Sequence, residues 1–554
     1  MIKVTSMKHQ SKVLLIVFIG VLIFSACSNK EPNLKTFYVN SISGNDVNDG
    51  TNHETAWKSL ERASENIYKP GEKLFLSNGV TFKGKLNLKG GGSKESPVIV
   101  SGYDSGDGNK SFPVINAKGY VAGIQIQNGR HFIIGKLEIT ADAGDLAEPE
   151  AQNKRYGVYI SANEPGEYSN IHLHDLHIHH IFASENIQKD GAKATSNIGY
   201  GIYVQMQNKE AKIKNIKIDY CNIEMTGHTG IRLNGAGDET GRVYLDSITI
   251  ENNYLKNIGG PGMVPGTCEN VVVRGNVTDH TGSSIDARMH ARGSGIWTWT
   301  CNNVLIEKNK FMHAHGKADS HGAHIDFNCK NVVVQHNLSL DNAGGFVEIL
   351  GNNHNCCYRY NISINDGFRV KGENGASQEG KVLWTSGYVG RGNKKNGPYN
   401  SYIYNNTVFV KEGSRSCFSF TRTTEGILIA NNIFYIQGKT VDVSGDQDTQ
   451  VEDKNRTIEN AIFKNNLFQK SNILPGSLII KDSEPLIGNP MFTNPGGLIA
   501  EDYIPQNMDL IKDKGIKIEK IPGDEIGLTI GLEVESDYFG NAISGLPDIG
   551  AIEL

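Results

Sequence analysis

Short runs of alternating hydrophobic and polar residues recur along the middle of the chain, and each run is followed by an asparagine. The unit reads hydrophobic-x-hydrophobic-x-x-Asn. Alternation with a period of two predicts β-strands, and a repeat of about 20 to 35 residues predicts a solenoid. Asparagine tolerates left-handed turns, and stacked asparagine side chains can bond one another from coil to coil. Successive spacings are 23, 33, 28, 24, 45, 26 and 34 residues, at Asn253, Asn276, Asn309, Asn337, Asn361, Asn406, Asn432 and Asn466.

We therefore predict an all-β fold, a parallel β-helix in which Asn276, Asn309, Asn337 and Asn361 stack in one column. Upstream of the repeats, residues 37–40 read as a strand and residues 56–63 as a helix with Thr55 as its N-cap. A terminal helix of this kind can cover the open end of a solenoid. This opening resembles that of secreted right-handed β-helix proteins, and residues 547–553 resemble their ending in Bacteroidetes. The resemblance implies a right-handed β-helix with an N-terminal capping helix.

The first 27 residues are predicted to be a targeting segment. Lys3, Lys8 and Lys12 precede an apolar stretch at residues 13–24, which is short for a membrane span. The following Ser25-Ala26-Cys27 resembles a bacterial lipobox, which implies lipidation of Cys27 and an outer-membrane lipoprotein held only by that anchor; an ordinary cleaved signal is the alternative. The expected organisation is a signal at 1–27, a tether at 28–35, a cap with the first strands at 36–97, a β-helix at 98–480 and a C-terminal cap at 481–554.

Charge and cysteine usage narrow the function classes. The net charge is −5 and no basic run stands out, so nucleic acid is not an expected partner. Cys268, Cys301 and Cys329 occupy one repeat position and are expected to form a buried column, with a disulfide between coils left open. The absence of CxxC spacing argues against a structural zinc site.

Two polar segments could suggest a metal ion. Residues 170–180 are rich in histidine, but their strict alternation puts Ile171 and Leu173 on one face and His172 and His174 on the other, which an outward-facing polar row explains. The loop with Asp46, Asn48 and Asp49 could bind calcium, although turn chemistry accounts for it equally well. No cofactor is therefore expected to be required, and Ca²⁺ is left as an option.

The strongest candidate for chemistry is a pair of carboxylates on two successive coils. Residues 322–327 align without gaps with residues 344–349, so Asp326 and Glu348 take the same outward position while Ile325, Phe327, Val347 and Ile349 face the core. Adjacent strands would place the two carboxylates about 5 Å apart. Repulsion would then raise one pKa and lower the other, as glycoside hydrolysis requires. Asp326 and Glu348 are the predicted catalytic residues.

Polar and aromatic residues around this pair suggest a sugar-binding site. His324 shares the strand of Asp326, two tryptophans lie one coil earlier, and two basic residues lie one coil later. Inserted loops on one face are where solenoids place binding sites. The predicted substrate-binding residues are His324, Trp297, Trp299, His321, Lys317, Arg369, Lys371 and Asp286.

The segments 295–301, 324–329 and 341–346 resemble β-helix proteins of Bacteroidetes polysaccharide-utilisation loci, some of them similar to glycoside hydrolase family 141, which includes α-L-fucosidases and xylanases. The resemblance implies a hydrolase acting on a plant or algal polysaccharide or oligosaccharide. A second hypothesis is a polysaccharide lyase, in which a residue such as Lys317 or Arg369 takes a proton and the carboxylates hold calcium. The third is a non-catalytic glycan-binding solenoid.

Overall fold

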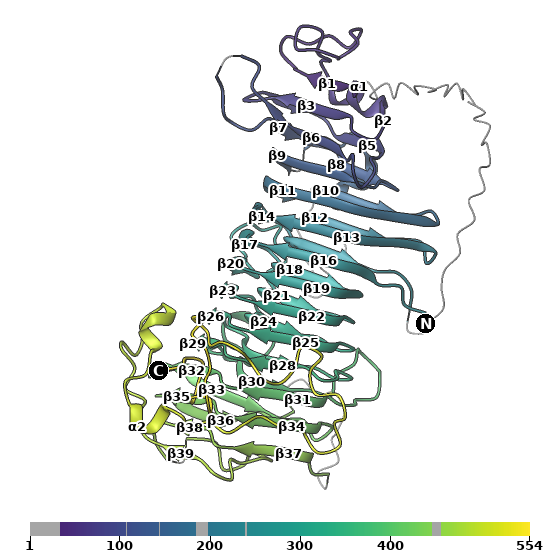
Figure 1. Ribbon diagram of the computed structural model, residues 1–554. Coiled ribbons are helices and arrows are strands. Elements are labelled where there is room, and N and C mark those ends of the chain that lie inside the picture. Colours follow the sequence, from purple (N-terminus) through teal and green to yellow (C-terminus); the bar gives the residue numbers. More distant parts are fainter. Residues whose placement is uncertain are drawn as a thin grey trace, which may run out of the picture. The chain divides into compact units, whose positions relative to one another are not determined.

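The computed structural model describes residues 34–106, 108–142, 144–183, 198–238, 241–445, 456–471 and 473–554. The unit formed by residues 35–554 is a column of parallel strands with β1 and α1 at one end (Figure 1). Cys27 and the rest of the predicted targeting segment lie outside the described residues, so lipidation stays a prediction. None of the helices in the described ranges has the length and apolar character needed to span a membrane.

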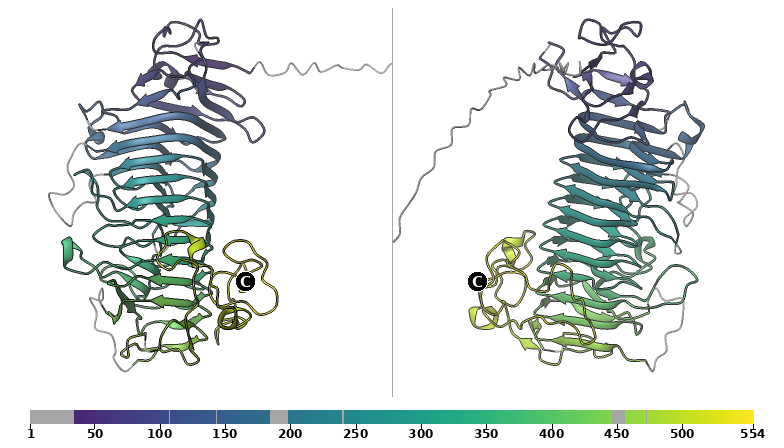
Figure 2. Two further views of the ribbon diagram at one scale, coloured as in Figure 1. Left: turned by 90° about the vertical axis from the view of Figure 1, so that its left-hand side faces the viewer. Right: turned by 45° about the vertical axis from the view of Figure 1, so that its right-hand side comes forward.

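The strands form three stacks that run the length of the column (Figures 1 and 2). The first stack comprises β1 (Thr36–Val39), β3 (Lys73–Ser77), β6 (Val98–Tyr103), β9 (Phe132–Asp142), β11 (Gly166–Phe182), β13 (Ala211–Asp219), β16 (Leu245–Glu251), β19 (Cys268–Arg274), β22 (Asn302–Glu307), β25 (Lys330–Gln335), β28 (Cys357–Arg359), β31 (Tyr399–Tyr404), β34 (Glu425–Ala430) and β37 (Glu459–Lys464).

The second stack shares the long strands β9 and β11 with the first. Its other members are β4 (Thr81–Lys83), β7 (Val114–Asn116), β14 (Asn222–Thr226), β17 (Tyr254–Ile258), β20 (Val277–Thr281), β23 (Lys310–Met312), β26 (Leu338–Leu340), β29 (Ile362–Ile364), β32 (Thr407–Val410), β35 (Ile433–Ile436), β38 (Leu467–Phe468) and β39 (Leu486–Ile487).

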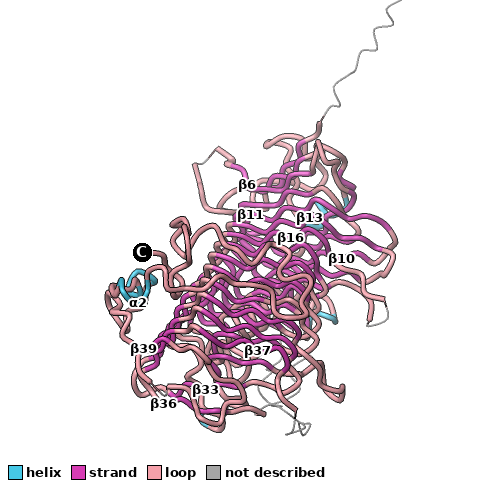
Figure 3. Tube along the Cα trace, turned by 60° about the horizontal axis from the view of Figure 1, so that its bottom comes forward, coloured by secondary structure: helices cyan, strands magenta, loops and turns pink. Residues whose placement is uncertain are grey.

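The third stack is a separate 13-stranded sheet. It comprises β2 (Ile67–Tyr68), β5 (Leu86–Gly90), β8 (Ala122–Gln127), β10 (Lys154–Ala162), β12 (Ile198–Met206), β15 (Ile231–Asn234), β18 (Met263–Gly266), β21 (Ile296–Thr298), β24 (Ala323–Ile325), β27 (Gly345–Ile349), β30 (Lys381–Thr385), β33 (Arg415–Ser419) and β36 (Lys439–Asp442). Within the described residues, the strands of stacked coils pair in parallel, which confirms the predicted β-helix. Figure 3 shows how strands dominate the column and how loops gather around it.

Inward-facing aliphatic residues of successive coils form the core. In the first stack, Ile248, Val271, Val304 and Val332 are register partners and are all almost completely buried. Such rows remove apolar surface from water in every coil, at about 25 cal/mol per Å². The parallel ladder already begins at β1, upstream of the boundary expected at residue 98.

The asparagine column is confirmed as a continuous hydrogen-bonded ladder. The Asn276 side-chain oxygen accepts from the backbone N–H of Asn253 at 3.0 Å and from its Nδ2 at 2.9 Å, and Asn309 does the same for Asn276. Asn337 and Asn361 continue the pattern. The left-handed residue is the one before each ladder asparagine, such as Lys308 with φ 55°, and not the asparagine itself. The side chain therefore satisfies buried backbone groups at the turn rather than relieving backbone strain.

The capping helix starts later than predicted. Helix α1 spans Leu60–Glu65, and its N-cap is Ser59, whose hydroxyl accepts from Arg62 N at 3.1 Å. Thr55 instead donates to Asp49 at 2.7 Å within the preceding loop. Asp46 accepts from the backbone N–H groups of Lys58 and Ser59, so its carboxylate fixes the entry into the helix. The calcium option for this loop stays a prediction.

The predicted cysteine column is present and carries no disulfide. Cys268, Cys301 and Cys329 are fully buried free thiols, and Cys301 N lies 3.4 Å from Cys329 Sγ. Burial raises the pKa of the Cys301 and Cys329 thiols well above the usual value. The thiols therefore act as small apolar residues that fill one corner of the coil.

The C-terminal segment packs along the side of the last coils (Figure 1). Ile549 and Ile552 join the outward-facing Ile362 and Ile433, while Ile521 and Leu528 pack beside Tyr402. Helix α2 (Met508–Ile511) belongs to this covering. The outer faces of these coils are apolar because they are covered by chain rather than by water.

Candidate active site

The register of the third stack differs from the gap-free alignment. Ile325 of β24 pairs with Ile349 of β27, which places His324, and not Asp326, opposite Glu348. One outward row therefore runs Trp297, His324, Glu348 and Trp384. The prediction that Asp326 and Glu348 are direct strand neighbours is wrong, because the true offset between these coils is two residues longer than in the alignment. Because Asp326 and Glu348 are not opposite each other in this register, strand spacing does not support the expected distance of about 5 Å between the two carboxylates.

Asp326 and Glu348 nevertheless line the same cavity, together with a third carboxylate, Asp319. The cavity has a volume of about 350 Å³ and opens on the outer face of the third stack. Asp326 lies just after the end of β24, where the chain leaves the sheet. The described lining residues are Arg292, Trp297, Asp319, His324, Asp326, Glu348, Leu350, Ser377, Gln378 and Tyr388.

Asp319 is held as an anion by a two-pronged ion pair. Arg292 Nε lies 2.6 Å from Oδ2 and Nη2 lies 3.2 Å from Oδ1 of this carboxylate. Burial alone would raise the pKa of Asp319, but the Arg292 guanidinium outweighs it and holds the pKa well below the usual range. The backbone of Asp319 and Ser320 is left-handed, with φ of 49° and 67°.

Asp326 has the opposite electrostatic environment. Burial raises its pKa to about 8, and the charges of Glu348 and Asp319 add to the rise, while a hydrogen bond from Phe327 N opposes it. At neutral pH the side chain is therefore mostly a carboxylic acid. One protonated and one ionised carboxylate share the cavity, which is the division of charge that acid–base catalysis needs.

Glu348 lies deeper, between two histidines. Oε2 is 2.7 Å from His321 Nδ1 and Oε1 is 3.3 Å from His324 Nε2, although neither contact has hydrogen-bond geometry. All three side chains are nearly inaccessible. Burial raises the pKa of Glu348 to about 7 and lowers the pKa of both histidines. The cluster is therefore held mainly uncharged by desolvation.

Aromatic rings form the walls of the cavity and extend beyond it. Trp297 faces outward beside His324, with ring centroids 5.6 Å apart. Trp299 also faces outward and packs edge-on against Phe327, which in turn packs against Tyr388. Phe327 was expected in the core but is half-buried on the outside, since β24 ends at Ile325 and the alternation stops there. Exposed aromatic faces of this kind suit the apolar face of a sugar ring.

The other predicted binding residues are not among the described residues that line the cavity. Arg369 is buried and donates to Gly316 O and Gln378 O, so it clamps two loops at the rim. Lys317 and Lys371 are exposed on those loops. Asp286 binds Arg288 at 2.8 Å in a separate loop that reaches Asp142. His321 Nδ1 lies 2.7 Å from Glu348 Oε2, and His321 is not among the described residues that line the cavity.

The sequence offered a signal for the residues that the strand alignment missed. Gln378 and Tyr388 lie on loops within the unusually long interval of 45 residues between Asn361 and Asn406. Arg292 and Asp319 lie on the insertions just upstream of β21 and β24. Excess length in a repeat marks an inserted loop, and here the inserted loops supply the walls of the cavity.

Comparisons with known proteins agree with this architecture. A family model described as a right-handed β-helix region matches residues 200–380. The chain therefore has a right-handed parallel β-helix fold. A solved GH136 lacto-N-biosidase from Eubacterium ramulus superposes with a TM-score of 0.54 and 21% identity, covering 74% of this chain and 68% of that one. A complex named XylC with xylose gives a TM-score of 0.50 at 10% identity, covering 94% and 98%.

A curated lacto-N-biosidase from Bifidobacterium longum subsp. longum is 24% identical over an alignment that covers 94% of this chain. The chain spans only 36% of the length of that relative. Both of these relatives are lacto-N-biosidases by name. The resemblance to glycoside hydrolase family 141 stays a prediction.

Proposed function

We propose that the protein is a glycoside hydrolase that cleaves an oligosaccharide or polysaccharide in the cavity of the third stack. The observation that supports it most is the contrast between two carboxylates in one cavity: Asp319 is paired with Arg292, and burial raises the pKa of Asp326 to about 8. The names of the relatives, both lacto-N-biosidases, favour the same reaction class.

In the proposed mechanism Asp326 is the general acid. Its carboxylic acid donates a proton to the glycosidic oxygen as the bond to the leaving sugar breaks. Asp319, kept ionised by Arg292, faces the positive charge that develops on the sugar ring and acts either as the nucleophile or as the base for a water molecule. Glu348, which the sequence predicts to be catalytic, is neither the acid nor the nucleophile or base in this scheme. It is a positioning residue whose charge state sets the field around Asp326.

The walls of the cavity suggest how a sugar would be held. Trp297 and Tyr388 offer aromatic faces, while Gln378 and Ser377 offer hydrogen-bonding groups from the inserted loop. Lacto-N-biose glycosides are the first substrates to test because of the relatives' name. A panel of plant and algal polysaccharides covers the substrate class predicted from the sequence.

The lyase hypothesis is less well supported. It needs a basic residue in contact with the substrate, and Lys317, Arg369 and Lys371 are not among the described lining residues. The basic side chains in that lining set are His324, which is nearly inaccessible beside Glu348, and Arg292, which is bound to Asp319. A guanidinium held by a carboxylate is a poor proton acceptor.

The test uses the glycan panel with two readouts, reducing ends and absorbance at about 235 nm, which reports the double bond left by elimination. Hydrolysis gives reducing ends alone. Asp326→Asn and Asp319→Asn should each lower kcat by about 10²-fold or more, because an amide keeps the shape but cannot exchange a proton. Asp286→Asn, at a carboxylate outside the cavity, is the matched control and should keep wild-type activity.

Two outcomes would contradict this assignment. Absorbance rising together with reducing ends would make the protein a lyase. Saturable glycan binding with neither readout, across the whole panel, would make it a non-catalytic solenoid.

We also propose that the chain is an outer-membrane lipoprotein anchored through Cys27. The basic, apolar and small-residue segments before Cys27 support this. Cys27→Ala should release the protein from the membrane fraction and change its electrophoretic mobility. A variant that stays membrane-bound with unchanged mobility would refute the anchor.

A further inference from the structure

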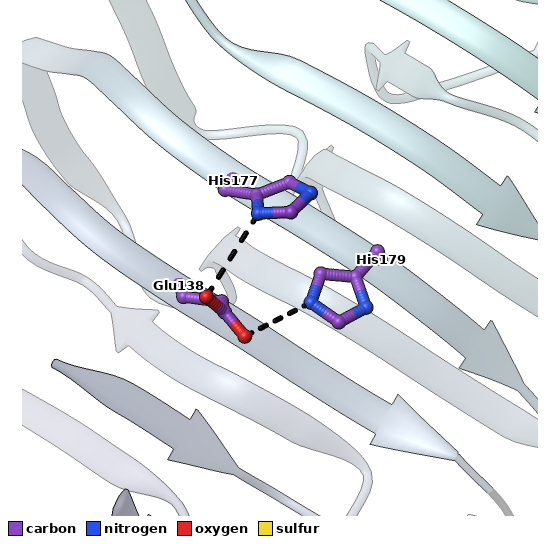
Figure 4. Close-up of side chains that lie close together, drawn as sticks. All are labelled: Glu138, His177 and His179. Carbon is purple, nitrogen blue, oxygen red and sulfur yellow. Dashed lines mark hydrogen bonds and ion pairs between the residues drawn. The ribbon is translucent and has the colours of Figure 1, made fainter. Parts of the chain in front are cut away.

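A second group of histidines and carboxylates lies on the second stack, away from the cavity of the third stack. Glu138 from β9 lies between His177 and His179 from β11 (Figure 4). Glu138 Oε1 is 3.1 Å from His179 Nε2, and Oε2 is 3.9 Å from His177 Nδ1. The ligand-type atoms of the three side chains all lie within 4.8 Å of one another. Four-coordinate zinc sites hold His nitrogen and carboxylate oxygen about 2.0–2.2 Å from the ion, which requires this kind of convergence.

The outer nitrogens of both histidines are occupied by other side chains. His177 Nε2 is 3.0 Å from Glu224 Oε1 on β14, and His179 Nδ1 is 2.8 Å from His180 Nδ1. A histidine that donates its outer N–H to a carboxylate presents its inner nitrogen as a lone pair. His177 has this carboxylate–histidine arrangement with Glu224, and it is the one that orients metal-binding imidazoles in proteins; the outer partner of His179 is the His180 ring.

The same strand provides an internal comparison. His172 and His174 repeat the spacing of His177 and His179 five residues earlier, and their rings are similarly close, at 4.9 Å against 4.5 Å. Their register partners on β9 are Ile133 and Gly135, whereas the partner of His177 is Glu138. His172 is bound to Asp219 and His174 to its neighbour Asp175. The earlier pair therefore lacks a carboxylate between the two rings.

Accessibility also separates this group from a buried structural network. The side chains of Glu138, His177 and His179 are 32%, 33% and 18% exposed, so an ion can reach them from solvent. A mixed nitrogen and oxygen donor set suits Zn²⁺ better than Ca²⁺ or Mg²⁺, which prefer oxygen ligands.

We propose that Glu138, His177 and His179 form a Zn²⁺ site that ties β9 to β11, with Glu224 and His180 orienting the two imidazoles. The fourth position faces solvent and would be taken by water. The site lies on a different sheet from the cavity, so its role is to bind an ion and brace the coils rather than to act on the glycan.

The test is calorimetric titration of the metal-free full-length protein with ZnCl₂, together with Co²⁺ as a spectroscopic probe. Wild type should bind Zn²⁺ saturably, and Co²⁺ should give the visible absorption bands of a tetrahedral site. His177→Ala/His179→Ala should lower the Zn²⁺ affinity of this site at least tenfold and abolish the Co²⁺ bands. The matched control, His172→Ala/His174→Ala, removes two histidines from the same strand and should change neither.

Glu224→Gln provides a variant that leaves all three ligands in place. It should weaken Zn²⁺ binding by about 10-fold, in the range measured for outer partners of metal ligands. The proposal is wrong if wild type shows no saturable Zn²⁺ binding. It is also wrong if the His177/His179 and His172/His174 double variants bind Zn²⁺ alike, which would assign the ion to other histidines such as His313 beside Asp279.

Discussion

Among the described residues, one glutamate lies against two histidines on the second stack, and another glutamate does so on the third. In both groups each carboxylate oxygen faces a different imidazole: Glu138 faces His177 and His179, and Glu348 faces His321 and His324. The groups differ in burial. The Glu138 side chain is 32% exposed, whereas that of Glu348 is 1% exposed. The same three side-chain types are therefore placed in two different dielectric environments.

The difference in burial changes what each group can do. Around Glu138 the outer ring nitrogens are bound by Glu224 and His180, and water reaches the centre. Around Glu348 no described group forms a hydrogen bond with the ring nitrogens of His321 and His324. Desolvation raises the pKa of Glu348 and lowers the pKa of both histidines. Unpaired buried polar atoms are costly, and their persistence is typical of functional sites. The exposed Glu138 group is suited to binding a metal ion. The buried Glu348 group is suited to controlling the protonation state of Asp326.

The largest expected difference between the two groups is in catalysis. Glu348→Gln should lower kcat by about tenfold or more above neutral pH, where Glu348 is ionised, because it removes a charge that adds to the effect of burial in raising the pKa of Asp326. A positioning role also predicts that the alkaline limb of the kcat/KM profile moves to lower pH in this variant. Glu138→Gln is the control with the same chemical change and should stay within twofold of wild type. Equal effects of the two substitutions would remove the distinction between the groups.

A smaller effect is expected from the aromatic wall, which only the buried group has. Trp297 stands beside His324 and faces the cavity. Trp297→Ala should raise KM by about tenfold with a small change in kcat, since a stacked ring contributes about 1 kcal/mol or somewhat more to binding. Trp299→Ala, one position further along the outer face, is the comparison. If Trp297→Ala lowers kcat alone, the ring positions the acid rather than the sugar.

Much of the fold could be predicted because each coil repeats the same local requirements. The alternation that buries Val271 and Val304 and the asparagine that satisfies the turn are properties of a few consecutive residues. The start of α1 was predicted less well. Its N-cap is decided by Asp46, which is distant in sequence and binds the backbone of Lys58 and Ser59.

The candidate site was predicted only in part, because it depends on register and on loops. Asp326, Glu348, His324 and Trp297 do meet in one cavity. The partner of His324 is Glu348, however, since the coil from β24 to β27, which includes β25 and β26, is two residues longer than the alignment allowed. Asp319 is ionised because Arg292 folds back onto it from another loop, a tertiary contact with no local sequence pattern.

The last expected effect is on stability, and its sign follows from the raised pKa of Glu348. This pKa is about 7 in the folded protein, against 4.5 as its ordinary value. The neutral acid is the form that the fold favours, so its contribution to stability is fully present below about pH 4.5 and is lost as the pH rises through 7. The shift corresponds to about 3 kcal/mol at most. Glu348→Gln should therefore gain stability relative to wild type between pH 5 and pH 8 in denaturant unfolding followed by tryptophan fluorescence. A Glu348→Gln curve parallel to wild type across this range would show that burial does not set the charge of Glu348.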